Sequence, residues 1–396
     1  MKKILVLLIS LMTFCGAISA AESEPVLSVG AGAFDFKCKG AFDGITMRVD
    51  YYVPADGDIS NMPIQFVMSG IDRNSDVYRD AWIGRADQYK VIVLAPHFSA
   101  EDFPSSLYQL GNVKAAYQQS DCSLMTYTII DDIFLYVKEL VNSSQTQYNL
   151  YGHSAGAQFV HRFVLFYHSP LLNKAVAANA GTYTFPTDEA KYQFGYSSIG
   201  GMAQWDVTQA LAKKLTLFIG ENDTERDNNL NVTTEADEQG LTRKERGANF
   251  YLQWANTARL LGMRYVWKIK QIEGVSHSNN RMSPVAADFL YDGTSQDNEP
   301  GIIPPGSTDI LNGDLDLDGK ISVIDLVLMN QVISGKFKPQ QVDGYYPLTM
   351  SELVEDAALF GDLDHNGEFT SVDIEQLVQV MLGTKQAERV IKHHIK

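Results

Sequence analysis

The chain has 396 residues, of which 45% are hydrophobic and 11% aromatic, enough apolar side chains for about two folded domains. Its formal net charge of −16 argues against nucleic acid as a partner, because phosphate binding needs a basic surface. The negative charge is concentrated near the C-terminus, where residues 308–383 hold 14 Asp and Glu against 3 Lys and Arg. This acidic segment predicts a short C-terminal module that binds calcium.

The N-terminus has the pattern of a secretory signal peptide over residues 1–21. Two basic residues, Lys2 and Lys3, precede the apolar run 4–14, and small residues follow at 17–21. The apolar run is too short to span a bilayer, and no later stretch is apolar enough to do so. We therefore expect a secreted protein without a transmembrane segment.

Signal-peptide cleavage would leave two cysteines, Cys38 and Cys122. In an oxidising compartment they would form a disulfide, and the alternative is two buried thiols. The sequence leaves both alternatives open, and it shows no cysteine-based metal site.

Residues 22–292 alternate short apolar runs with helical patterns, which is typical of an α/β protein. The predicted strands are 64–68, 91–94, 148–151, 175–178 and 215–219, and the clearest predicted helices are 126–140 and 155–167. Runs that are apolar throughout indicate strands buried on both faces of a mostly parallel sheet.

A Gly-x-Ser-x-Gly motif, Gly152-His153-Ser154-Ala155-Gly156, lies between the predicted strand 148–151 and the helix that follows. This strand–turn–helix setting is the one that a nucleophile elbow requires, and it projects the serine hydroxyl above the sheet. The motif therefore predicts an α/β-hydrolase fold with Ser154 as the nucleophile.

A serine hydroxyl needs a base to accept its proton and an acid to orient that base, and in this fold the chain order is Ser, Asp or Glu, then His. Of the four histidines after position 200, three lie in a predicted metal loop or in the basic tail, which leaves His277 as the base. Asp223 follows the strand 215–219 and is the predicted acid, with Glu221 and Asp227 as alternatives.

Backbone amides are expected to stabilise the oxyanion that forms during ester cleavage. One donor is the N–H of Ala155, directly after the nucleophile. The other comes from the loop after the strand 64–68, where we choose the N–H of Ile71.

Substrate selection is expected from segment 182–205, which lies between the strand 175–178 and the acid loop and is rich in aromatic residues. Tyr183, Phe185 and Trp205 are its candidate substrate-binding residues, since aromatic rings suit an aromatic acyl group or the face of a sugar. The alternative is a cap that packs these rings on its own core.

Three segments together resemble secreted bacterial α/β-hydrolases of the polyhydroxybutyrate-depolymerase-like and feruloyl or acetyl-xylan esterase groups. They are residues 70–74 together with 78–82, the elbow 152–156, and Gly274-Val275-Ser276-His277. The resemblance spans roughly 30–290 and implies the fold and the catalytic triad. Such enzymes usually carry His-Gly where this chain has Ser69-Gly70, so any role of that histidine is missing here.

A linker over residues 293–307 precedes a duplicated unit, in which the segment 313–319 recurs 48 positions later as 361–367. Each copy has oxygen-bearing side chains at the spacing of a calcium loop, with Gly at position 6. The predicted ligands are Asp314, Asp316, Asp318, the Lys320 carbonyl and Asp325 in the first loop, and Asp362, Asp364, Asn366, the Glu368 carbonyl and Asp373 in the second.

Position 12 of both loops is Asp rather than Glu, and only the helix after each loop is present. In this the segment 308–383 resembles a type I dockerin, a small all-α module with two Ca²⁺ ions that binds cohesin domains. The resemblance implies a cohesin of a scaffold or cell-surface protein as the partner, and a basic tail over 384–396 completes the chain.

These patterns predict a secreted serine esterase, possessing an α/β-hydrolase domain over 22–292 and docked through its C-terminal module. The dockerin resemblance favours acetyl or feruloyl groups on plant cell-wall polysaccharides as substrate, and implies association with a cellulosome or cell surface. A polyester depolymerase or lipase-like esterase is the alternative, and a non-catalytic scaffold-binding protein is the third hypothesis.

Overall fold

A computed structural model describes residues 27–201, 205–260 and 265–293, and beyond them 309–311, 313, 321, 326–327, 329–330, 333–334, 361–364, 366, 368, 370–382 and 389–391. Within them, no helix is both long enough and apolar enough to cross a membrane. The predicted signal peptide, all of the linker beyond Gly293, and the predicted middle of the dockerin-like module lie outside the described residues.

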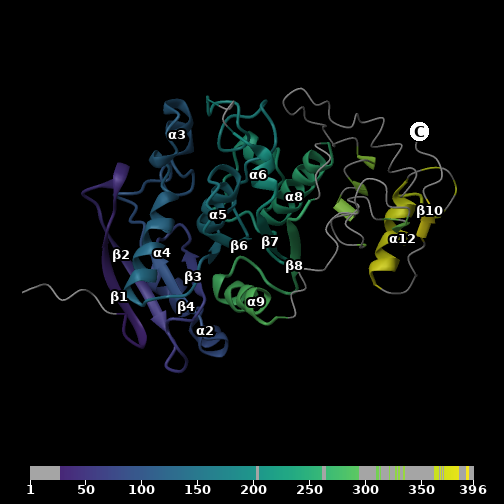
Figure 1. Ribbon diagram of the computed structural model, residues 1–396. Helices are drawn as coiled ribbons and strands as arrows, with labels where there is room; N and C mark the ends of the chain where they lie inside the picture. Colours follow the sequence, from purple (N-terminus) through teal and green to yellow (C-terminus); the bar gives the residue numbers. More distant parts are fainter. Residues whose placement is uncertain are drawn as a thin grey trace, which may run out of the picture.

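An eight-stranded sheet forms the centre of the first domain, in the order β1-β2-β4-β3-β5-β6-β7-β8 (Figure 1). Its strands are β1 (Gly30–Lys37), β2 (Thr46–Val53), β3 (Ile64–Met68), β4 (Ile92–Pro96), β5 (Tyr148–His153), β6 (Leu172–Ala178), β7 (Lys214–Gly220) and β8 (Lys268–Ile272). Strands β1 and β2 are antiparallel to their neighbours, and the other strands pair in parallel. The predicted mostly parallel sheet is confirmed.

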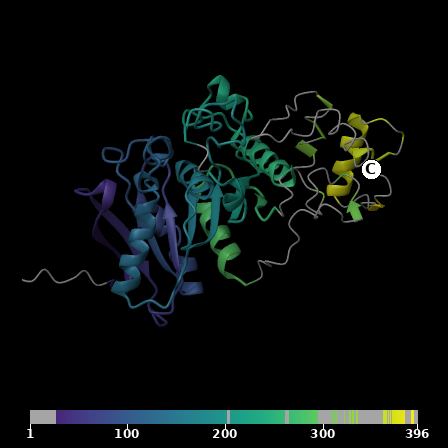
Figure 2. The same ribbon diagram turned by 45° about the horizontal axis from the view of Figure 1, so that its top comes forward.

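Helices cover both faces of this sheet. They are α1 (Ser75–Asp80), α2 (Ile83–Tyr89), α3 (Val113–Gln119), α4 (Thr128–Leu140), α5 (Ala155–Phe166), α6 (Val207–Leu211), α7 (Thr234–Asp237), α8 (Arg243–Leu260) and α9 (Asn279–Tyr291), with 3-10 turns at Gly40–Phe42 and Cys122–Leu124. One core contains residues of α4, α5 and α8, and a second contains residues of α1, α2 and α9. Figure 2 shows α8 and α9 on opposite sides of the sheet from a second angle.

Side chains of the central strands alternate between these two cores. Phe66 and Met68 of β3 enter the core beneath α4 and α5, while Val67 enters the core beneath α2 and α9. All five residues of β3 and of β4 are buried, because helices cover both sheet faces. The carboxyl ends of the parallel strands therefore open onto one edge of the sheet, where loops carry the functional side chains.

The described parts of the C-terminal region include α12 (Ser371–Met381) and a pair of short antiparallel strands, β9 (Asp309–Leu311) and β10 (Arg389–Ile391). Met329, Leu363 and Leu377 form a small core with Ile321, Leu326 and Ile374, which unites residues of both repeats. Strand β10 belongs to the predicted basic tail, and its pairing with β9 brings the two ends of the module together.

Candidate active site

Ser154 lies at the sharp turn between β5 and α5, with φ 59° and ψ −115°. The backbone strain falls on the serine itself, because neither Gly152 nor Gly156 has a positive φ. The glycines instead permit close packing. A Cβ atom on Gly152 would lie 2.3 Å from the Gly156 carbonyl oxygen, and one on Gly156 would lie 2.1 Å from the Met68 carbonyl oxygen. The predicted elbow therefore exists, and its glycines hold α5 against β3 and β5.

The structure brings the predicted serine, histidine and aspartate together. His277 Nε2 lies 3.0 Å from Ser154 Oγ, and His277 Nδ1 lies 2.8 Å from Asp223 Oδ2. Asp223 follows β7 and is only 1% exposed, whereas His277 follows β8 and is partly open to the pocket. This arrangement can transfer the serine proton to a histidine whose second nitrogen is held by a buried carboxylate.

The two alternative acids contact other groups. Glu221 accepts a hydrogen bond from the backbone N–H of Gly274 (2.6 Å), in the loop that carries His277. Asp227 accepts hydrogen bonds from both terminal nitrogens of Arg243, at 2.9 and 2.8 Å. These hydrogen bonds lower the pKa of Asp227. Neither carboxylate contacts His277, so Asp223 is the residue in the position of the acid.

Arg243, which the sequence reasoning missed, begins α8 and is only 1% exposed. Its Nη1 also lies 3.5 Å from Asp223 Oδ1, the carboxylate oxygen that does not face His277. A guanidinium therefore stands between Asp223 and Asp227, and its positive charge faces both carboxylates. No local motif marks such a residue, since it lies 20 positions after Asp223 and on another element.

The predicted oxyanion donors lie at the elbow and in the pocket wall. The backbone N–H of Ser154 donates to the Ala178 carbonyl oxygen (2.9 Å). For the N–H groups of Ala155 and Ile71, no hydrogen bond to another described residue is found. Ile71 lines the pocket beside Ser154, and its role as a donor stays a prediction.

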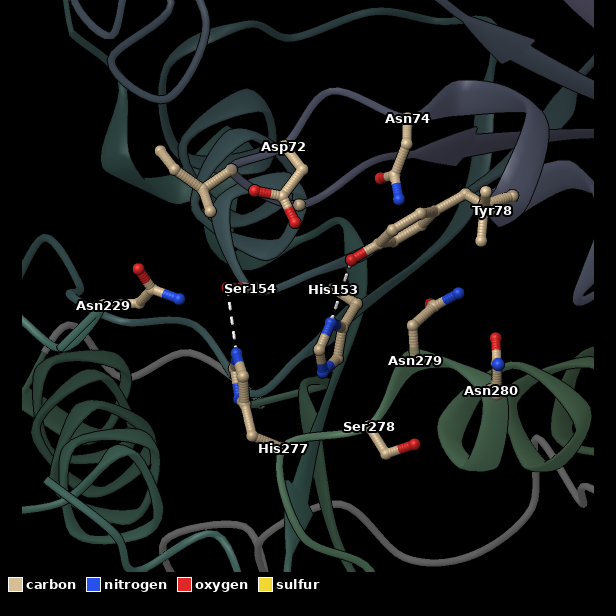
Figure 3. Close-up of a pocket in the computed structure, with 13 residues that line it drawn as sticks. Asp72, Asn74, Tyr78, His153, Ser154, Asn229, His277, Ser278, Asn279 and Asn280 are labelled. Carbon is tan, nitrogen blue, oxygen red and sulfur yellow. Dashed lines mark hydrogen bonds between the residues drawn. The ribbon is translucent and has the colours of Figure 1, made fainter. Parts of the chain in front are cut away.

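A pocket of about 320 Å³ opens beside Ser154 and His277 (Figure 3). Among the described residues, its wall contains one carboxylate, four amide side chains and two exposed aliphatic side chains, and no Lys or Arg. These are Asp72; Asn74, Asn229, Asn279 and Asn280; and Ile71 and Val77. The sequence reasoning did not find the asparagines, because Asn is common in turns for conformational reasons alone.

The prediction that Tyr183, Phe185 and Trp205 line the substrate pocket is wrong. Tyr183 and Phe185 are buried and pack against Phe250, and the Trp205 ring packs against Phe166 and Trp254. None of the three belongs to the pocket wall. The rings are more stable in a shared core than beside an open cleft, so the alternative of a cap packed on its own core holds.

The predicted ligand residues of the second calcium loop are among the described residues. Carboxylate oxygens of Asp362, Asp364 and Asp373 lie within 4.8 Å of one another. The loop backbone is held by hydrogen bonds from the N–H of Asn366 to Asp362 and Asp364, and from the N–H of Glu368 to the Asn366 side chain. This oxygen-rich donor set fits a hard cation such as Ca²⁺.

Asp373 also accepts a hydrogen bond from the N–H of Thr370 and caps α12. The predicted ligands of the first loop, Asp314, Asp316, Asp318, Lys320 and Asp325, lie outside the described residues.

The two cysteines of the first domain are free thiols, Cys38 buried and Cys122 exposed. The sequence left open a disulfide or two buried thiols. The structure has no disulfide between Cys38 and Cys122, and only Cys38 is a buried thiol. Burial raises the pKa of the Cys38 thiol to about 11, so Cys38 stays protonated at neutral pH.

Two solved structures share this fold and a recognisable part of the sequence. Poly(aspartic acid) hydrolase-1 from Sphingomonas sp. KT-1 is 36% identical over 67% of this chain and 100% of its own, with a TM-score of 0.61. LpqC, a poly(3-hydroxybutyrate) depolymerase from Bordetella parapertussis, is 27% identical over 67% of this chain and 91% of its own, with a TM-score of 0.60.

A ferulic acid esterase is more distant, at 11% identity and a TM-score of 0.41 over 67% of this chain and 98% of its own. No protein-family model and no curated protein matches the sequence.

Proposed function

We propose that this chain, which belongs to the family of poly(aspartic acid) hydrolase-1, removes small acyl groups from hydroxyl-rich polymers. It is a serine hydrolase of the α/β-hydrolase type and a carboxylic ester hydrolase. Acetyl esters of plant cell-wall polysaccharide are the substrate class that we favour. The observation that carries this proposal is the wall of the pocket beside Ser154, which is rich in amides and holds one carboxylate.

In the proposed reaction, Ser154 Oγ attacks the ester carbonyl while His277 Nε2 takes its proton. His277 then passes this proton to the departing alcohol oxygen, and the acyl group stays on the serine. Water, deprotonated by His277, releases the acid and restores the serine. Asp223 keeps the proton of His277 on Nδ1, and the N–H groups of Ala155 and Ile71 donate to the oxyanion.

The charge of the pocket discriminates between polymer substrates. Poly(aspartic acid) carries a carboxylate on each unit, and a binding site for it needs cations. The pocket wall has Asp72 and no Lys or Arg, and the whole chain has a net charge of −16. A polyanion would therefore be repelled, whereas the side-chain amides of Asn229, Asn279 and Asn280 both donate to and accept from hydroxyl groups.

The pocket beside Ser154 fits an acetyl group better than a feruloyl group. A ferulate ring would need an aromatic or broad apolar wall, and the three aromatic side chains predicted for that role pack in the core instead. Among the residues that the structure describes, Tyr78 is the one Phe, Tyr or Trp in the pocket wall. A small acyl group needs only the space next to Ser154.

A second candidate function is polyester depolymerisation. The likeness to the poly(3-hydroxybutyrate) depolymerase favours it, and so do the exposed side chains of Ile71 and Val77, at 46% and 45%. A neutral polyester could lie on these two side chains without a charge penalty.

A substrate panel tests the assignment: acetylated xylan, methyl ferulate, poly(3-hydroxybutyrate) and poly(aspartic acid), with product acid measured by titration. We expect the highest rate on acetylated xylan and about 100-fold less on poly(aspartic acid). Asp72→Asn should narrow this difference, while Asp76→Asn, an equally exposed change outside the pocket wall, should not. Faster cleavage of poly(aspartic acid) than of any ester would refute the proposal.

We further propose that the protein is secreted and that its C-terminal module binds two Ca²⁺ ions and docks to a cohesin domain. Metal would relieve the repulsion among Asp362, Asp364 and Asp373, which lie close together at the start of α12. Isothermal titration of the full chain with Ca²⁺, and then with a panel of cohesins in Ca²⁺ and in EDTA, tests this. Binding of cohesins that is unchanged by EDTA would refute the calcium role.

A further inference from the structure

A tyrosine hydroxyl that the reaction above does not use lies against the nucleophile. Tyr78 of α1 is 8% exposed, and its Oη lies 3.2 Å from His153 Nδ1. Gly70 comes close to this hydroxyl, because a Cβ atom on Gly70 would lie 2.5 Å from Tyr78 Oη. Ser154 Cβ and Tyr78 Oη both lie within 4 Å of the same point, the position that a Cβ on Gly70 would take. Figure 3 shows the hydroxyl pointing into the space between Ser154 and His153.

The hydrogen of this hydroxyl can be assigned from its partners. His153 is 3% exposed, and its Nε2 has no hydrogen-bond partner among the described residues. If Nε2 carried the proton, a buried N–H would have no acceptor, which is rarer and more costly than a bare acceptor nitrogen. The proton of neutral His153 therefore belongs on Nδ1, from which it donates to Tyr78 Oη.

Burial lowers the pKa of His153, and the neighbouring His277 and Arg243 lower it further, so His153 stays neutral at the pH at which a serine hydrolase works. Tyr78 Oη then accepts a hydrogen bond from His153. Its own O–H has no acceptor in this pair and is free to donate into the pocket that Tyr78, Gly70 and Ser154 line together. Burial raises the pKa of Tyr78, so the hydroxyl keeps its proton.

We propose that the Tyr78 hydroxyl is a third oxyanion donor, and that His153 is a positioning residue that fixes the direction of this donor. The inference rests on the proposed serine-esterase chemistry. When Ser154 Oγ adds to the ester carbonyl, the carbonyl oxygen gains a negative charge. Tyr78 O–H donates to that oxygen together with the N–H groups of Ala155 and Ile71, and no proton is transferred from the tyrosine.

His153 takes a second part in this arrangement. Its ring packs on the His277 ring, with 4.6 Å between the centroids, so the residue that directs Tyr78 also contacts the base. The histidine inside the motif thus connects the oxyanion donor on α1 with the base after β8.

Tyr78→Phe removes the donor and keeps the ring, and Tyr52→Phe is the control, since the Tyr52 hydroxyl bonds to exposed Asp87 on the surface. On p-nitrophenyl acetate we expect Tyr78→Phe to lower kcat about 100-fold and to leave KM within about 3-fold. The rate at which a fluorophosphonate probe labels Ser154 should fall in parallel, because its phosphoryl oxygen occupies the same donors. The midpoint of thermal unfolding of both variants is measured alongside.

The role of His153 is tested by a pair of variants. His153→Asn places an amide N–H near the former Nδ1 and should stay within about 5-fold of wild type, while His153→Leu should lose about as much kcat as Tyr78→Phe. The double variant Tyr78→Phe with His153→Leu should lose little more than Tyr78→Phe alone, because both act through one donor.

A Tyr78→Phe variant with kcat and labelling rate within about 3-fold of wild type would overturn the proposal for Tyr78. Full additivity of the two losses would overturn the positioning role of His153. If the probe does not label Ser154 in the wild type, the serine-hydrolase mechanism itself fails, and the inference fails with it.

Discussion

Replacing Asp223 by Asn tests the catalytic geometry more sharply than removing the side chain, because the shape is kept. Asp223 Oδ2 accepts from His277 Nδ1 at 2.8 Å, and Oδ1 faces Arg243 Nη1 at 3.5 Å. A guanidinium has only donors, so the amide oxygen that Asp223→Asn introduces would turn to Arg243, and the new NH₂ group would turn to His277. The NH₂ group would donate to Nδ1 and place the histidine proton on Nε2, facing Ser154 Oγ.

The size of the effect follows from this tautomer. A base whose lone pair points away from the serine cannot accept its proton, and the same error in a Ser-His-Asp protease lowers kcat about 10⁴-fold. This corresponds to about 5.4 kcal/mol of activation free energy. We expect a loss of about this size for Asp223→Asn on p-nitrophenyl acetate. Adding Arg243→Leu frees the amide to rotate, and should restore at least about 10-fold of the lost kcat relative to Asp223→Asn alone.

The matched control is Asp227→Asn, which changes a partner of the same Arg243 but no contact of His277. It should lower kcat by less than about 10-fold, since the tautomer is unaffected. Thermal unfolding separates loss of folding from loss of chemistry in each variant. The reasoning is refuted if Asp223→Asn keeps more than a tenth of the wild-type kcat, or if Asp227→Asn loses as much as Asp223→Asn does.

Further predictions concern the nucleophile, the elbow, the thiols and the metal loop. Ser154→Ala should lower kcat about 10⁶-fold without lowering the unfolding midpoint, and an equal rate in the two proteins would end the serine mechanism. Gly156→Ala should destabilise by about 1–3 kcal/mol in urea unfolding, although Ala usually stabilises a helix, because its Cβ would lie 2.1 Å from the Met68 carbonyl oxygen. At pH 8 iodoacetamide should modify exposed Cys122 but not Cys38, whose pKa burial raises to about 11, and mass spectrometry of the native protein showing both modified would contradict this. EDTA should reduce helical circular dichroism in the wild type more than in Asp364→Ala, whose loop would bind Ca²⁺ weakly from the start.

The central strands could be predicted because burial on both faces leaves a direct trace in the sequence. Every residue of β3 and β4 is apolar or buried, and the predicted runs at 64–68 and 91–94 fall on these strands within one or two residues. Strands β1 and β2 were not predicted. They form an antiparallel pair at the sheet edge, and β1 begins with Gly and Ala residues and alternates exposed with buried or partly buried positions, so no continuous apolar run marks it.

Strand β8 shows a related limit of the sequence pattern. The segment 265–270 has the residue pattern of a strand, but β8 begins only at Lys268. Tyr265 and Trp267 instead pack their rings into the core beneath α8. Aromatic residues are common both in strands and at the approaches to them, so the run alone does not show where the hydrogen bonds to β7 begin.

The pocket wall was less predictable than the catalytic residues for a geometrical reason. Segment 182–205 has many aromatic residues, and composition does not tell which side of a loop faces the cleft. In the structure, buried Arg162 bonds to Thr184 and to the carbonyl of Gln193, which draws this segment onto α5. The rings then fill the core beside α8, and the pocket is left to short polar side chains from other loops.

The acid illustrates best what the chain order could and could not decide. Glu221, Asp223 and Asp227 lie within seven positions after β7, and the sequence treated them as competitors for one role. In the structure each has its own contact: Glu221 holds the backbone of the histidine loop, Asp223 holds the imidazole, and Asp227 holds the guanidinium beside Asp223. The three carboxylates lie close together because each supports the same pair. Glu221 fixes the loop that carries the histidine, and Asp227 holds the guanidinium whose charge faces Asp223. The alternatives were parts of one assembly, and only their distances separate the acid from its supports.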